Sequence, residues 1–127
     1  SWVFSPDGKR VAYNFYDEQK KRRVIGVKPV EGNEPEQIYD YLPDLQFGRD
    51  QHWSKGKFVL QQWTKDGFLC LGKEIFLLPL DGGKPRHLTH FNTSDTLYAC
   101  EISPDGKHMV FARGALTFDA VLVTNFR

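Results

Sequence analysis

Apolar and polar residues alternate along several short stretches of the chain. Val11, Tyr13 and Phe15 stand at every second position after a first turn, and residues 108–112 repeat this pattern. A period of two is typical of β-strands whose two faces differ. Residues 75–78 (Ile-Phe-Leu-Leu) have no polar face, which favours a strand covered on both sides. We expect further strands at residues 24–27, 75–80 and 120–124 and short ones at 36–39 and 86–88, and no stretch has a helical period.

A turn sequence separates these stretches and recurs along the chain. Ser5-Pro6-Asp7-Gly8-Lys9 returns as residues 103–107, and residues 64–67 (Thr-Lys-Asp-Gly) are a third copy without the proline. Proline presets φ, aspartate bonds back to the backbone and glycine accepts a positive φ, so the sequence predicts tight hairpin turns. Because the aspartates repeat with the turns, we interpret them as turn residues rather than as a metal or acid–base site. The predicted turn residues are Pro6, Asp7, Gly8, Asp66, Gly67, Pro104, Asp105 and Gly106.

A second landmark sets the length of the repeat. Residues 28–38 align with residues 78–88, and the prolines and the first glycine of the two segments coincide. Thr64 and Ser103 are 39 residues apart, close to the length of one propeller blade. Ser5 and Thr64 are 59 residues apart. This distance is longer than one repeat. The landmarks assign nine of the extra residues to a loop around 17–23 and eleven to the stretch between about 40 and 57.

The predicted fold is all-β, with three four-stranded antiparallel blades of a β-propeller that form half or a fragment of a roughly six-bladed ring. Residues 1–127 form a single propeller segment. Blade one is expected at about 1–40, an inserted connection at about 40–57, blade two at about 57–90, and an incomplete blade three at about 95–127. Three blades cannot close a ring, so the chain either belongs to a larger propeller or forms a homodimer that completes the ring.

The charge balance narrows the range of partners. The chain has 17 basic and 16 acidic side chains and a formal net charge of +1. This balance gives no long-range field for nucleic acid or anionic lipid, and no apolar run is long enough for membrane insertion. Residues 20–23 (Lys-Lys-Arg-Arg) form a local basic cluster, which we interpret as a solvated loop tip rather than a nucleic-acid contact. The first residues do not resemble a signal peptide, and the sequence leaves the compartment open.

Few side chains suggest chemistry. Cys70 and Cys100 are flanked by apolar residues, which predicts two buried thiols, with a disulfide as the alternative. His87 and His90 would lie on opposite faces of a strand, and we expect neither a metal site nor a cofactor. The sequence contains no Gly-x-Ser-x-Gly motif, phosphate loop or paired-cysteine motif, so no catalytic residue is predicted.

The Ser-Pro-Asp-Gly-Lys repeats, residues 79–89 and residues 118–126 (Phe-Asp-Ala-Val-Leu-Val-Thr-Asn-Phe) resemble the TolB-like propeller repeats. The resemblance covers nearly the whole chain. It implies a non-catalytic module that binds protein or ligand, in the C-terminal part of a larger bacterial signalling or envelope protein, and a periplasmic location if the context is that of TolB. One alternative is a substrate-gating propeller fragment of a serine peptidase. A third interpretation is a structural half-propeller that completes another chain.

The inserted connection is the predicted binding segment. It contains Tyr41, Phe47, Arg49, His52 and Trp53, and aromatic residues and arginine dominate binding hot spots. Loops on a rigid scaffold are also common places for recognition. We therefore expect a protein or peptide partner at this segment. The alternative is that Phe47 and Trp53 pack beneath the connection and anchor it.

Overall fold

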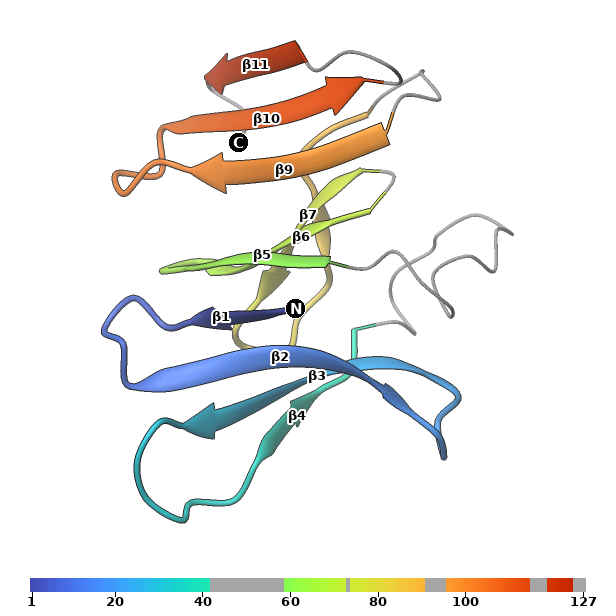
Figure 1. The fold of residues 1–127 in the computed structure, drawn as a ribbon, viewed down its shortest axis with the longest axis vertical. Helices are drawn as coiled ribbons and strands as arrows, with labels where there is room; N and C mark the ends of the chain where they lie inside the picture. The colour runs from blue at the N-terminus through green and yellow to red at the C-terminus, as the bar shows by residue number, and fades with distance from the viewer. Residues whose placement is uncertain (42–58, 73, 91–95, 115–118, 125–127) are drawn as a thin grey trace.

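The computed structural model describes residues 1–41, 59–72, 74–90, 96–114 and 119–124. These residues form three antiparallel sheets and no helix (Figure 1). The first sheet has the order β1 (Trp2–Phe4), β2 (Arg10–Asp17), β3 (Arg22–Pro29), β4 (Gln37–Tyr39). The second has the order β5 (Val59–Thr64), β6 (Gly67–Leu71), β7 (Ile75–Pro79), β8 (Arg86–His87). The third contains β9 (Thr96–Ile102), β10 (His108–Gly114) and β11 (Asp119–Thr124), again in sequential order.

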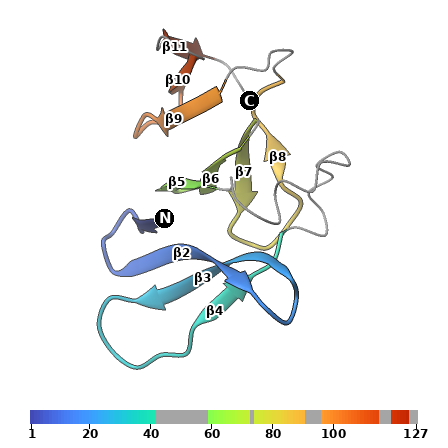
Figure 2. The ribbon, with the colours of Figure 1, turned by 45° about the vertical axis from the view of Figure 1, so that its right-hand side comes forward.

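The three sheets are arranged as blades of a β-propeller. The first strands of the sheets lie on the inside, where β5 contacts both β1 and β9, whereas β4, β8 and β11 lie at the outside (Figures 1 and 2). The predicted all-β fold of antiparallel blades is therefore confirmed, with four, four and three strands among the described residues. We call the sheets blades one, two and three.

Polar side chains on the inner strands link the blades. Leu60 N on β5 donates a hydrogen bond of 3.1 Å to Ser1 Oγ beside β1. The side-chain amide of Gln62 accepts a hydrogen bond from Ile102 N at 2.8 Å and donates one to Ile102 O at 3.1 Å. Because a two-point amide contact fixes orientation as well as distance, it sets how β5 and β9 face each other.

Two apolar clusters hold the blades together, one on each side of blade two. The strand β6 is buried along its whole length. Its side chains alternate between the clusters, with Phe68 and Cys70 in the first and Leu69 and Leu71 in the second. The first cluster lies between blades one and two, and the second between blades two and three. The strand β7 is buried on both faces over residues 75–78, as the absence of a polar face predicts.

The extra length of blade one differs in place from the prediction. We assigned nine residues to a loop around 17–23, but β2 and β3 have eight residues each, whereas β6 and β7 have five each. Six of the nine residues therefore lengthen the two strands. The residues of this hairpin tip, 17–23, are polar, so no apolar alternation marks the ends of β2 and β3 as strand. The inserted connection after Tyr41 lies outside the described residues.

The two cysteines are free thiols. Cys70 belongs to the first cluster and Cys100 to the second, so they are core residues, and the disulfide alternative is wrong. The part of the chain that the structure describes also holds no helix with the length and apolar character needed to cross a bilayer.

Candidate binding site at the turn end

The repeated Ser-Pro-Asp-Gly turn is stabilised by its own side chains. Asp7 Oδ1 accepts hydrogen bonds from Ser5 Oγ at 2.6 Å and from Lys9 N at 2.9 Å. Ser5 Oγ in turn accepts from Arg10 N at 3.0 Å, and Gly8 closes the turn with φ of 72°. The hydrogen bond from Ser5, followed by that from the backbone of Lys9, lowers the pKa of Asp7.

The turn of blade three reproduces these contacts. Asp105 Oδ1 accepts from Ser103 Oγ at 2.5 Å and from Lys107 N at 3.0 Å, and Gly106 again has φ of 72°. The pKa of Asp105 is lowered by the same two hydrogen bonds, that from Ser103 first. These contacts give both aspartates a local role in holding the turn.

The turn of blade two is shorter, since only Lys65 and Asp66 lie between β5 and β6, and threonine and lysine stand where the other turns have serine and proline. Thr64 Oγ1 donates to Gly67 O at 3.0 Å and accepts from Asp66 N at 3.2 Å. Gly67 has φ of 150°, and a Cβ added there would overlap the carbonyl oxygen of Leu78. Glycine is therefore needed at this position both for its conformation and for the close approach of β7.

The three turns meet at one end of the blades, which we call the turn end. The antiparallel order also brings the β3–β4 and β7–β8 turns to this end, as the hydrogen bond of 2.9 Å from Val30 N to Lys9 O shows. The aspartates were expected at separated, equivalent turns. Asp7 and Asp105 each bond within their own turn, yet other residues of all three turns, with Asp66, line one cavity.

The cavity has a volume of about 790 Å³, within the range of ligand pockets. Its walls are apolar and rigid, since they combine proline rings with buried side chains of blades two and three. Its other lining side chains include three cations and one carboxylate. The lining residues are Pro6, Gln62, Trp63, Thr64, Lys65, Asp66, Leu77, Pro79, Lys84, Pro85, Arg86, Leu88, Ile102, Ser103, Pro104 and Gly106.

The indole of Trp63 is fixed from two sides. It packs edge-on against Phe68, with ring centroids 4.9 Å apart, and the guanidinium of Arg10 from blade one lies 4.9 Å from its centroid. A cation at this distance over an indole is attractive. Together with the Gln62 amide contacts, these interactions preform the wall of the cavity.

The rim cations Lys65, Lys84 and Arg86 were not singled out from the sequence. All three side chains are exposed, so their positive charges are hydrated and accessible. They outnumber the single lining carboxylate, Asp66. The sequence did hold a sign of them. Lys84 and Arg86 follow the glycine turn at residues 81–83, and in an antiparallel blade that turn must lie at the same end as the Ser-Pro-Asp-Gly turns.

Of the residues predicted as a binding segment, the structure describes only Tyr41. Phe47, Arg49, His52 and Trp53 lie outside the described residues. Tyr41 is 4% exposed, donates a hydrogen bond of 2.5 Å to Pro79 O and stacks on Tyr39 at 5.8 Å. Burial raises the pKa of the Tyr41 phenol. The structure therefore shows Tyr41 joining blade one to blade two, with its side chain inside the protein.

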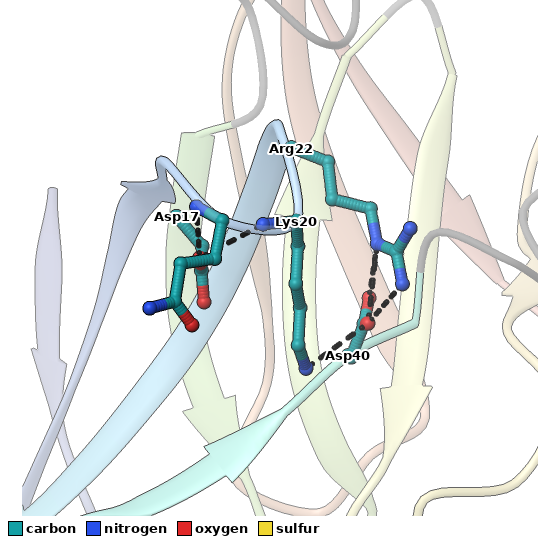
Figure 3. Close-up of polar contacts among 5 residues, drawn as sticks. Asp17, Lys20, Arg22 and Asp40 are labelled. Carbon is teal, nitrogen blue, oxygen red and sulfur yellow. Dashed lines mark hydrogen bonds and ion pairs between the residues drawn. The ribbon is translucent and has the colours of Figure 1, made fainter.

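The basic cluster at residues 20–23 is partly paired. Arg22 forms a bidentate ion pair with Asp40, with an Nη2–Oδ2 distance of 2.6 Å, and Lys20 Nζ lies 3.4 Å from the same carboxylate (Figure 3). Burial raises the pKa of Asp40, but the hydrogen bond and charge of Arg22 outweigh it and hold this pKa below its ordinary value. Asp17 Oδ1 accepts from the backbone of Lys20 at 3.0 Å and shapes the tip. The cluster thus ties the β2–β3 hairpin to the residue that follows β4.

The two histidines do not lie on opposite faces. The rings of His87 and His90 are parallel within 6°, with centroids 5.9 Å apart, and His87 also packs edge-on against Phe76 at 4.5 Å. The prediction is wrong because β8 ends at His87, so the strand period no longer governs His90. No group of three or more histidine, cysteine, aspartate or glutamate side chains within the described ranges could hold a metal ion.

Comparison with known proteins shows the fold. No protein-family model matches the chain, and no curated protein matches it. The chain is similar to a solved structure described as "putative TolB from Agrobacterium tumefaciens", with a TM-score of 0.66 and 16% sequence identity. The likeness covers 98% of this chain and 45% of that protein, so the chain spans less than half of its length. At this identity the likeness shows a TolB-like fold and no more.

Proposed function

We propose that the chain is a non-catalytic β-propeller module that binds an acidic, partly apolar peptide segment of a partner protein in the turn-end cavity. The cavity itself is the observation that carries the proposal. It combines a volume of about 790 Å³, buried apolar walls and an excess of positive charge at its rim. The TolB-like fold supports a binding role, because propeller faces are rigid scaffolds for recognition.

The apolar walls favour a peptide with apolar side chains. Leu77, Leu88 and Ile102 are each at most 8% exposed and line the cavity together with proline rings. Such a wall gains from covering apolar groups and loses nothing in conformational entropy, because its side chains are already fixed by packing. An extended peptide is narrow enough to enter a space of this volume, whereas a folded domain would contact only the rim.

The rim charges favour an acidic sequence. Lys65, Lys84 and Arg86 face a single lining carboxylate, Asp66. Complementary charge at a rim mainly raises the rate of association and makes binding sensitive to salt. An acidic peptide would therefore bind faster and more tightly at low ionic strength than a basic peptide with the same apolar residues.

The connection after Tyr41 is proposed as a second contact surface. Its sequence supplies the aromatic and cationic residues Phe47, Arg49, His52 and Trp53. Tyr41 fixes the start of the connection through its buried ring and its hydrogen bond to Pro79. Its own side chain would position the segment rather than touch a partner.

The test is fluorescence anisotropy with two labelled peptides, in which leucine and proline alternate with either glutamate or lysine. The glutamate peptide should bind, and its affinity should fall as salt is raised. The double variant Lys84→Glu, Arg86→Glu should weaken binding about tenfold, since two exposed charge contacts are each worth on the order of 0.5–1 kcal/mol.

Lys9→Glu is the matched control, because Lys9 is an exposed lysine that follows the first turn and does not itself line the cavity. It should leave the affinity within about twofold of the parent chain. Equal binding of both peptides, or unchanged binding by the Lys84→Glu, Arg86→Glu variant, would refute the cavity as the site. The variant Arg49→Glu in the same assay shows whether the connection contributes.

A further inference from the structure

Among the described residues, two sheet faces of the propeller segment carry exposed apolar side chains. On β1, Trp2 and Phe4 point away from blade two, because Val3 between them packs on the first cluster. Trp2 is 71% exposed and Phe4 58% exposed. On β10 and β11, Val110 and Leu122 point away from blade two and are 43% and 66% exposed. We call these surfaces the blade-one face and the blade-three face.

The sequence repeat shows which residues of blade three correspond to those of the blade-one face. Aligning the Ser-Pro-Asp-Gly turns of blades one and three places Trp2, Phe4, Val11 and Tyr13 at the positions of Cys100, Ile102, Met109 and Phe111. In blade three those four side chains are buried against blade two. The same positions thus form an interface in blade three, whereas in blade one Trp2 and Phe4 are exposed and Val11 and Tyr13 are half-buried.

The exposed residues of the blade-three face likewise correspond to buried residues of blade one. The alignment places Val110 at the position of Ala12, and the strand registers place Leu122 at that of Val27. Ala12 and Val27 are buried in the first cluster against blade two. A blade face of this kind therefore normally receives the opposite kind of face from the next blade.

The two faces also differ in shape. The blade-three face borders a hollow of about 450 Å³, whose lining includes the small side chains of Ala99, Ala112 and Ala120 together with Gln61 and Gln62 of β5. The blade-one face carries the large, exposed rings of Trp2 and Phe4, which suit such a hollow. Lys28 and Glu36 both lie beside the Tyr13 ring on the blade-one face, so that face has charges of both signs.

We propose that a second copy of this chain covers both faces, with the blade-one face of each copy packed on the blade-three face of the other. Copies joined through two different faces form a closed ring only when the rotation from each copy to the next adds up to a full turn. Two sets of three blades make six, which is within the range of closed propellers. The occupant is a second copy because the chain itself carries both halves of the contact. This proposal is independent of the peptide-binding function.

The first measurement is the solution mass of the chain by light scattering after size exclusion, at micromolar concentration. The expected mass is twice the monomer mass of 14.7 kDa. Phe4→Arg and Val110→Glu should each give a folded monomer, as checked by far-UV circular dichroism. Val30→Arg is the control, because Val30 is an equally exposed apolar residue in a turn outside both faces, and it should remain dimeric.

Mixing the two monomeric variants provides the decisive step. A dimer of one Phe4→Arg chain and one Val110→Glu chain has one unaltered contact and one contact in which opposite new charges meet, so the dimer mass should return. A monomer mass for the parent chain would overturn the proposal and assign the faces to further blades of a longer polypeptide. Filaments in place of a closed dimer, or dimers that neither variant disrupts, would overturn it as well.

Discussion

Replacement of Gly67 by alanine tests whether the shortened turn of blade two depends on close contact between strands. Gly67 opens β6 and pairs with both Thr64 and Pro79. An added Cβ would overlap the carbonyl oxygen of Leu78 and lie 3.0 Å from its carbonyl carbon. These are backbone atoms of a central strand, so they cannot rotate away as the end of a side chain can.

The expected cost has two parts. A side chain at φ of 150° costs on the order of 1–3 kcal/mol in backbone strain. Moving β7 aside would also weaken one or two ladder hydrogen bonds, worth about 1 kcal/mol each. Gly67→Ala should therefore destabilise the fold by about 2–5 kcal/mol, a large fraction of the stability of an ordinary domain.

Gly8→Ala and Gly82→Ala are matched controls for the contact. Their φ values are 72° and 79°, and an added Cβ at either position meets nothing within 4 Å. Each should cost only the left-handed conformation, about 1–2 kcal/mol. The difference between Gly67→Ala and these controls measures the contact itself.

Equilibrium urea unfolding followed by circular dichroism and tryptophan fluorescence gives the comparison. The midpoint should fall most for Gly67→Ala, while the slope with denaturant stays that of the parent chain, because the same surface is exposed on unfolding. If Gly67→Ala costs no more than Gly8→Ala, the close approach of β7 does not constrain this turn and the reasoning is refuted.

Three further outcomes are expected. Phe68→Ala, which removes a fully buried ring from the first cluster, should lower the free energy of unfolding by about 3–5 kcal/mol, and a loss below about 1 kcal/mol in urea unfolding would contradict tight packing between blades one and two. The folded-state pKa values of Asp7 and Asp105 are lowered, so the two ionised carboxylates stabilise the fold fully above the unfolded pKa of about 3.9, and this stabilisation is lost as pH falls through the lower folded pKa. Thermal melts should therefore show a melting temperature that falls in acid. The fall should be smaller in the Asp7→Asn, Asp105→Asn variant. Burial raises the pKa of Cys70, and that of Cys100 to about 12, so both thiols should resist Ellman's reagent at pH 8 and react only after denaturation, whereas rapid reaction of the folded chain would place a thiol at the surface.

The repeat and the alternation of apolar residues were enough to predict the blades. The turn residues carry most of that information, because Ser5, Asp7 and Gly8 have one consistent arrangement wherever the motif appears. Apolar alternation then places the strands on either side, and β7 shows that a run without a polar face is covered by two neighbours.

The tip of the β2–β3 hairpin and the histidine pair could not be predicted by the same means. β2 and β3 pair as far as Asp17 and Arg22, although a polar sequence there suits a strand as well as a loop. His90 follows the end of β8, where the strand period no longer applies. Both failures occur at the end of a strand.

The cavity depends on a level of structure that sequence patterns do not describe. The strand order alone would have brought Lys84 to the same end as the Ser-Pro-Asp-Gly turns, but the space between them is set by the angle between blades. That angle is held by the amide of Gln62 on Ile102 and by Arg10 over Trp63. The turns therefore serve two purposes, since they close the hairpins and place rigid proline rings on the cavity wall. Changes in the turns should affect stability and binding together, whereas changes in the exposed rim cations should affect binding alone.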